Sequence, residues 1–190
     1  MELVAEKGYE ATTAAEIGLR AGFSRAMVHA RYGTKDVLLD ELMRTEYEEK
    51  LVPDIEPDAP GLQQVQAIID RLDSLASEDE RFLKGMFKLC FESVRGSPSL
   101  TPRVTAWLCD LEAAVGQRLK KGKKDGSVRA DVNIAVATRD MMITGSGIAF
   151  AWIVMPGTDL HNEYVRWQGR IANDYGQISR QPPPNRRSKR

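Results

Sequence analysis

The sequence has few of the residues on which covalent cross-links and metal sites depend. It contains two cysteines, Cys90 and Cys109, and two histidines, His29 and His161, among 190 residues. No Cys-x-x-Cys pair occurs, so we expect no disulfide framework, no zinc site, and no metal or cofactor of any other kind. Both cysteines lie in apolar helical patterns, which is typical of free thiols in a reducing cytoplasm.

Long hydrophobic runs and an excess of one charge are also missing. The longest apolar stretch, residues 141–155, is too short for a bilayer and includes Thr144, Gly145, Ser146 and Gly147. The first ten residues have no basic region before an apolar run, so no secretion signal is expected. Lys plus Arg and Asp plus Glu number 27 each, which excludes a protein coated in basic residues for nucleic-acid packaging. We expect a globular cytoplasmic protein without membrane partners.

Period-two alternation is absent, and apolar residues recur at the three-and-four spacing of helices, so an all-α fold is predicted. Gly8, Gly22 and Gly33 each follow a short apolar pattern and are expected to end helices. Thr13 with Glu16 forms a capping box, while Ser24 and Thr34 suit the starts of two further helices. The last of these is expected to run through Leu42 towards Leu51.

Proline and composition divide the chain into segments. Pro53, Pro57 and Pro60 mark a linker at residues 52–61, which separates residues 1–51 from a larger helical region at 62–180. In that region a second capping box is expected at Ser77–Glu80, a cap at Asp131 or Asn133, and another at Thr158 or Asp159. Residues 181–190 have no apolar side chain to bury and are expected to form a disordered basic tail, which includes Arg186, Arg187, Lys189 and Arg190.

Basic and acidic residues are distributed unevenly along the first fifty residues. Two short helices joined at residues 21–23 have the spacing of a helix-turn-helix. Between Ile17 and Lys35 the charged residues are all basic, although residues 1–50 hold seven basic and ten acidic side chains. A local concentration of basic residues of this kind favours phosphate binding. Glycine-capped helix pairs with scattered arginines also occur in purely structural proteins, and composition alone leaves both interpretations open.

Several motifs in this segment resemble the TetR family of transcriptional regulators. They are residues 6–13 (EKGYEATT), Glu16-Ile17, residues 21–24 (AGFS) and residues 32–39 (YGTKDVLL). Residues 126–133 (GSVRADVN) are similar to the loop before the long dimerising helix of many members. The resemblance implies an all-α homodimer with an N-terminal DNA-binding head and a C-terminal domain for ligand binding and dimerisation. Members normally have further residues before the position of Met1, so a truncated first helix is expected.

The resemblance also implies site residues. Its recognition helix corresponds to residues 24–32, with Tyr32 in the core, and helix starts suit phosphates. The DNA-contact candidates are Thr13, Ser24, Arg25, Ala26, Met27, His29, Ala30, Arg31, Thr34 and Lys35. His29 stands where the family usually has an aromatic residue, and Ala30 where it commonly has a bulky or basic one.

The C-terminal half is less informative, because stripes of Met and aromatic residues are more often plain core than ligand contacts. Candidates for a ligand pocket are Phe82, Met86, Phe87, Cys90, Trp107, Leu111, Met141 and Thr144. Small and aromatic residues suggest a dimer seam at Gly145, Ala149, Trp152, Leu160, Tyr164, Trp167 and Ile171.

The function predicted from these features is a ligand-responsive regulator, a repressor that binds a palindromic double-stranded DNA operator as a homodimer. Its effector would be small and largely apolar. The alternative is a ligand- or protein-binding helical module with an impaired DNA-binding head. No Ser-His-Asp set, carboxylate pair or metal-ligand cluster converges at helical spacing, so we do not expect an enzyme.

Overall fold

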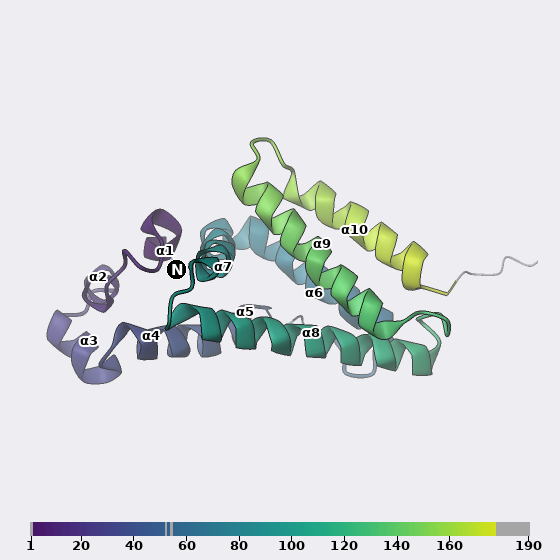
Figure 1. Ribbon diagram of the computed structural model, residues 1–190, viewed down its shortest axis with the longest axis horizontal. Coiled ribbons are helices and arrows are strands. Elements are labelled where there is room, and N and C mark those ends of the chain that lie inside the picture. Colours follow the sequence, from purple (N-terminus) through teal and green to yellow (C-terminus); the bar gives the residue numbers. More distant parts are fainter. Residues whose placement is uncertain (1, 52, 54, 178–190) are drawn as a thin grey trace, which may run out of the picture.

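The computed structural model describes residues 2–51, 53 and 55–177 as a succession of helices (Figure 1). Its only β-type pairing over these residues is an isolated bridge between Val128 and Gly176, so the predicted all-α class is confirmed. Two expected features, the basic tail at 181–190 and the end of the helical region predicted at 62–180, lie outside the described residues. Residues 52 and 54 of the expected linker lie outside them as well.

The head consists of four short helices, α1 (Glu2–Lys7), α2 (Ala14–Arg20), α3 (Arg25–Tyr32) and α4 (Lys35–Leu42). Each start after α1 has the expected side-chain cap. The Thr13 hydroxyl accepts from the Glu16 amide at 3.2 Å, and the Glu16 carboxylate accepts from the Thr13 amide at 2.9 Å, which completes the capping box. Ser24 and Thr34 accept from amides three residues later at 3.2 and 3.3 Å.

The turn between α2 and α3 depends on two glycines. Gly22 has a φ of +80°, a left-handed conformation that residues with a Cβ rarely adopt, and nothing else crowds it. Gly18 is required for space, because a Cβ there would lie 2.0 Å from Val28 Cγ2. The close approach of α2 and α3 buries Val28 and holds the rest of α3 away from the core.

The expected long helix after Thr34 is interrupted. α4 ends at Leu42, and a π-helical segment, η1 (Met43–Tyr47), connects it to α5 (Glu48–Leu51). The chain therefore stays helical to Leu51 as predicted, although with a change of hydrogen-bonding pattern in the middle.

The body begins at Gly61 and contains the longer elements α6 (Gly61–Glu78), α7 (Glu80–Glu92), η2 (Ser93–Arg95), α8 (Leu100–Asp125), α9 (Ile134–Val154) and α10 (Leu160–Tyr175). Figure 1 shows α8 running along one side of the molecule, with α9 and α10 side by side at the end away from the head. The fully buried core is concentrated in the body, where Leu75, Leu83, Met86, Leu89, Leu100 and Leu119 are at most 1% exposed.

The helix caps of the body show that the cap predicted at Ser77 is wrong. They also show which of the two candidate residues caps α9 and which caps α10. α6 continues to Glu78, so Ser77 is not a cap; Asp79 caps α7 by accepting from the Phe82 amide at 3.1 Å. Asn133 caps α9 and Asp159 caps α10 in the same way.

Replacing Gly18 by Ala tests the packing of α2 on α3. We expect Gly18→Ala to destabilise the head by about 1–3 kcal/mol, because the added methyl overlaps the stiff Val28 side chain. Urea unfolding followed by circular dichroism measures the loss. The double variant Gly18→Ala, Val28→Ala should recover part of it. Gly116 on α8, where a Cβ would be in ordinary contact with Thr138 at 3.4 Å, is the matched control: Gly116→Ala should cause no loss. An unaffected Gly18→Ala protein would contradict the packing described.

Candidate functional site

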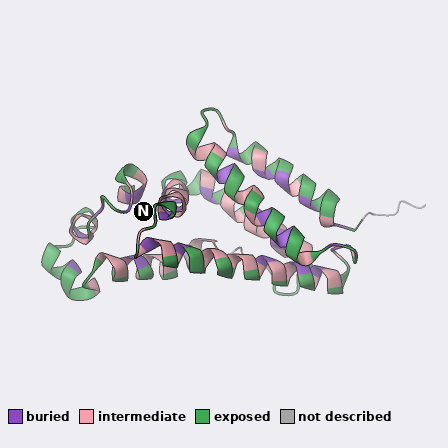
Figure 2. Ribbon diagram, viewed as in Figure 1, coloured by how far each residue is buried: buried purple, intermediate pink, exposed green. Residues whose placement is uncertain are grey.

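Helix α3 presents most of its surface to solvent (Figure 2). Of its eight residues only Val28 is buried, and Tyr32 is half-buried. The exposed side chains are those predicted to face DNA: Arg25, Ala26, Met27, His29, Ala30 and Arg31. The helix therefore offers two arginines, a methionine that is 56% exposed and two small alanines on one accessible surface.

The two arginines of α3 have no acidic partner among the described residues. Arg25 has no ion pair, and the Arg31 guanidinium only lies over the Tyr32 ring at 5.4 Å from its centroid. A charged group without a partner remains available to an external anion, whereas one already paired must first be released. Among the described residues of the head, Arg25 and Arg31 are therefore cations without an acidic partner.

The other basic residues of the predicted patch are engaged within the chain. Arg20 pairs with Glu6 at 2.7 Å and with Glu2 at 3.1 Å, and its hydrogen bond holds the pKa of the Glu6 carboxyl below its usual value. The Lys35 ammonium donates to the Tyr9 carbonyl at 3.0 Å and lies 4.0 Å from the centroid of the Tyr9 ring. Lys35 therefore ties α4 to the turn after α1, and its ammonium keeps two further donors.

The three candidate hydroxyls at helix starts are also accounted for. Thr13, Ser24 and Thr34 each cap a helix, so each hydroxyl oxygen accepts from a backbone amide of the first turn. The remaining free amides of these turns are donors of the kind that bind phosphate oxygens.

A large cavity of about 630 Å³ occupies the body. Six helices supply its walls, for example through Leu51 of α5, Ile69 of α6, Phe91 of α7, Leu108 of α8, Ala149 of α9 and Tyr164 of α10. Six of the eight predicted pocket residues line it: Met86, Phe87, Cys90, Trp107, Leu111 and Met141. Burial raises the pKa of the Cys90 thiol to about 12, so Cys90 is a neutral, apolar part of the wall.

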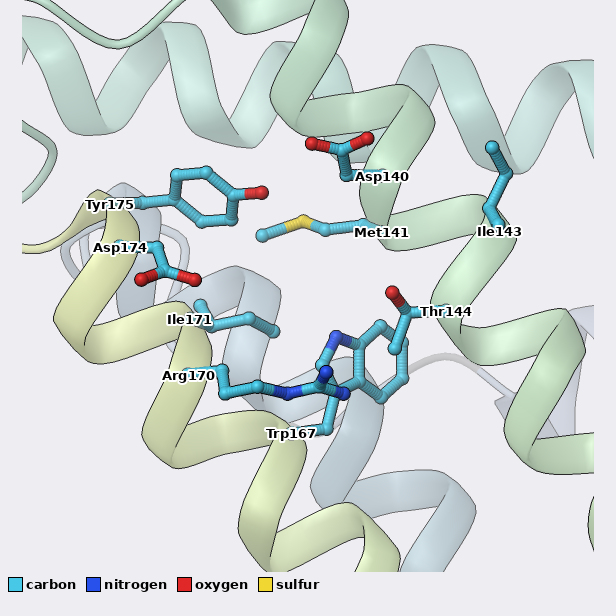
Figure 3. A pocket seen from close by; sticks show the side chains of 9 residues that line it. All are labelled: Asp140, Met141, Ile143, Thr144, Trp167, Arg170, Ile171, Asp174 and Tyr175. Carbon is cyan, nitrogen blue, oxygen red and sulfur yellow. The ribbon is translucent and has the colours of Figure 1, made fainter.

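The other two predicted pocket residues lie elsewhere. Phe82 is 3% exposed, belongs to the core, and has the Lys50 ammonium 4.4 Å from its ring centroid. Thr144 faces a separate groove of about 250 Å³ between α9 and α10 (Figure 3). Ile143 also lines that groove on α9, and so do Arg170 and Asp174 on α10.

Two charged residues, Asp110 and Arg118, line the large cavity, and the local sequence does not indicate that Arg118 faces it. Asp110 stands inside an apolar pattern and is recognisable there as a polar group. Arg118 belongs to a basic run, residues 118–124, that reads as ordinary charge at a helix end. Only the packing of α8 shows that Arg118 faces the cavity while Lys120 is exposed.

The residues predicted for the dimer seam pack inside a single chain. Ala149, Leu160, Tyr164, Trp167 and Ile171 are between 1% and 8% exposed. Gly145 packs against the Trp167 indole, which would lie 3.0 Å from a Cβ at this position, and Trp152 meets the Phe87 ring edge-on at 6.2 Å between centroids. Five of the seven are thus buried within the chain and help to hold α9 and α10 onto the body, while Gly145 and Trp152 are half-buried.

Helix α7 connects the cavity to the head. Its last turn carries Glu92, whose carboxylate accepts from the amides of Tyr9 at 2.6 Å and Glu10 at 2.9 Å. One turn earlier, the Lys88 ammonium donates to the Ala5 carbonyl. The intervening residues Cys90 and Phe91 line the cavity.

Tyr9 joins this contact to α4. It is 3% exposed, and its hydroxyl donates to the Asp36 carboxylate at 3.0 Å. Burial raises the pKa of Tyr9 to about 12, so the hydroxyl keeps its proton. A second link is the ion pair between Arg103 of α8 and Asp40 of α4, which holds the pKa of Asp40 below its usual value.

Comparison with known proteins agrees with this geometry. Residues 1–42, which span α1 to α4, match the profile of the family described as "Bacterial regulatory proteins, tetR family". The head of the chain therefore carries the TetR-family profile. No match is found among curated protein sequences.

Solved TetR-family structures share the fold of almost the whole chain. SmeT, described as the repressor of the Stenotrophomonas maltophilia multidrug efflux pump SmeDEF, has 21% identity and a TM-score of 0.71, over 95% of this chain and 88% of that one. A complex of SmeT with triclosan gives 23% identity and a TM-score of 0.75, over 95% and 90%. A TetR regulator from Haloarcula marismortui gives 18% and 0.72, over 92% of each chain.

Two further properties concern the described residues only. No three His, Cys, Asp or Glu side chains there gather as a metal-binding group. None of the helices described is long and apolar enough to cross a bilayer.

The clasp formed by Glu92 on Tyr9 and Glu10 is open to a direct test. We expect Glu92→Ala to increase amide hydrogen exchange in residues 8–12 by about tenfold or more, because the two amides lose a charged acceptor. Glu92→Gln keeps an oxygen acceptor and should show a smaller increase. Glu80→Ala removes an acid from the other end of α7 and should leave the exchange of residues 8–12 unchanged. Unchanged exchange in Glu92→Ala would show that the clasp does not hold the head.

Proposed function

We propose that this chain is a TetR-family regulator, a ligand-responsive repressor that binds an operator as a homodimer. The observation that carries the proposal is the surface of α3, where Arg25 and Arg31 are exposed and free of acidic partners while Arg20 beside them is neutralised by Glu2 and Glu6. Acidic residues thus occupy the side of the head near α1, and the free positive charge is concentrated on the proposed recognition helix.

The proposed DNA contacts divide into two classes. Arg25 and Arg31 suit bidentate hydrogen bonds to guanine in the major groove, and Met27 suits a thymine methyl. His29, Ala26 and Ala30 complete that surface. Thr13, Ser24, Thr34 and Lys35 stand at helix starts, where free amides and the helix dipole favour phosphates, and these contacts would set the register on the duplex.

The proposed dimer face is the outer surface of α9 and α10. On α9, Val136, Ile143, Phe150 and Val154 are 52–62% exposed and follow one another at spacings of seven, seven and four, so they form one stripe. Val165 of α10 is 53% exposed. A continuous apolar stripe of this kind on a helical surface is typical of an interface. Two-fold pairing through it would present two α3 helices to the two halves of a palindrome.

The cavity is the proposed effector site. Its volume lies within the range of small-molecule pockets, and its walls are mainly apolar. The structure of SmeT with triclosan, a TetR neighbour with a bound small molecule, supports this assignment by analogy of fold. A ligand that pushes on Phe87, Cys90 or Phe91 would displace α7, which also holds Tyr9 and Glu10 through Glu92. Coupling of this kind is reciprocal, so operator DNA would change effector affinity by the same factor.

Removing one free arginine from α3 tests the DNA assignment. A duplex that the protein selects from a random pool serves as operator. Arg25→Ala should weaken binding to it by about 1–3 kcal/mol and relax the preference at one base pair in each half-site. Fluorescence anisotropy over a range of salt concentrations measures both effects. Arg95→Ala, which removes an equally exposed arginine from η2, is the matched control and should leave specific binding unchanged. Equal losses in the two variants would contradict base recognition by α3.

A charge on the outer stripe tests the dimer. Ile143→Glu should shift the protein to monomers, because pairing would bury an unpaired carboxylate at the centre of the face. Sedimentation velocity measures the shift, and operator affinity should fall with it. Val94→Glu introduces the same charge at a valine that is 85% exposed, away from the stripe, and should leave the dimer intact. A dimer that survives Ile143→Glu would exclude this face.

A further inference from the structure

The side chain of Arg118 is unusual among the basic residues of the body. It lines the cavity from α8, and its Nη1 donates to the Ala114 carbonyl one turn earlier at 3.1 Å. Its Nε is buried and has no hydrogen-bond partner among the described residues, and no ion pair to a carboxylate is formed there. Neighbouring lysines differ in this respect: Lys121 donates to the carbonyls of Pro57 and Ala59, and Lys123 to that of Val132.

The Arg118 guanidinium has a buried N–H donor for which the described part of the chain supplies no acceptor. Buried donors in folded proteins almost always have an acceptor, and a charged donor without one is costly. The Arg118 Nε has no acceptor among the described residues, and most side chains that line the cavity, such as Leu111, Val115 and Val65, are apolar. An acceptor that enters with a ligand would complete the hydrogen bonding. The planar fork of Nε and Nη2 matches the two oxygens of a carboxylate.

The second charged residue of the cavity wall, Asp110, does not require a charged partner from a ligand. Asp110 is on the same helix, eight residues earlier, which corresponds to about 12 Å along its axis. Asp110 is exposed, so water solvates its carboxylate and no ligand cation is required. The cavity therefore has a hydrated acid in one part of its wall and an unsatisfied cation in another. This asymmetry favours a ligand with negative charge.

The cavity wall around these two residues is apolar. Leu111, Ala114 and Val115 lie between them along α8, Trp107 and Leu108 lie before Asp110, and Phe87 and Phe91 line the same cavity from α7. We infer that the effector is an amphiphile with a single carboxylate, bound to Arg118, and an apolar body lying along α8. This inference rests on the proposed function, because it names the ligand class of the proposed effector site.

Decanoate and decanamide form a matched pair of probes for the test, since they share the alkyl chain and differ only in the head group, a carboxylate in one and a neutral amide in the other. Isothermal titration calorimetry with the full chain measures both, and quenching of Trp107 and Trp167, which line the cavity, reports where they bind. Decanoate should bind about tenfold more tightly than decanamide or better, the difference expected for charge-assisted hydrogen bonds. Arg118→Met should abolish that preference, and Arg118→Lys should keep part of it.

Lys120→Met is the matched control, because it removes a positive charge two residues away on the exposed side of α8. It should leave both affinities unchanged. Equal binding of acid and amide to the unmodified protein would overturn the inference, and this comparison does not depend on the folding of any variant. Tighter binding of decyltrimethylammonium would overturn it in favour of Asp110, and failure of all three probes to bind would overturn it as well. Operator binding in the Arg25 experiment stays a separate readout, so loss of the carboxylate preference and loss of the regulatory function are distinguishable.

Discussion

The arrangement of the molecule depends on helix α7 serving two neighbours at once. Its apolar face closes the cavity through Met86, Phe87 and Cys90, while its last turn holds the head through Glu92. An acid at a helix C-terminus is unfavourable with respect to the helix dipole. The two amides of Tyr9 and Glu10 compensate for that cost, so the position of Glu92 is explained by the head and not by α7 itself.

The positive charges of the head are divided between cations that are paired within the chain and cations that are free. Arg20 and Lys7 are paired with acids near α1, and Lys7, through its hydrogen bond, is the main cause of the lowering of the Glu16 pKa to about 2. Lys35 is tied to Tyr9. Cations close to the body thus stabilise the head, and the cations on α3 stay free. A DNA-binding surface requires this separation, because a phosphate or base can only replace water at a cation that has no internal partner.

Local features of the fold were predictable because they depend on a few neighbouring residues. Thr13 with Glu16, Ser24, Thr34, and the glycines at 8, 22 and 33 act as expected, since caps and left-handed turns are determined within one turn of helix. Ser77 shows the limit of such reasoning. It has a capping-box spacing to Glu80, but the packing of α6 carries that helix past it to Glu78.

Features that depend on which face of a helix is buried were not predictable. α9 is apolar around most of its circumference, so the sequence did not distinguish Ala149, which is buried, from Phe150 and Ile143, which are exposed. The stripe from Leu160 to Ile171 was correctly identified as apolar, although its partner is the body of the same chain. Arg118 was hidden for a related reason, because a basic run at a helix end resembles solvated charge until the helix is packed.

The distance between the two recognition helices of the dimer tests the connection between cavity and head most directly. Nitroxide labels at position 29, in a His29→Cys, Cys109→Ser protein whose remaining native thiol at Cys90 is half-buried in the cavity wall and protonated, report that distance by pulsed electron resonance. Ala114→Phe fills part of the cavity without any external ligand. Because α7 contacts both the cavity and the head, we expect the distribution of distances between the two labels to shift when Ala114→Phe fills the cavity. Identical distributions in the two proteins, both dimeric and folded, would contradict it.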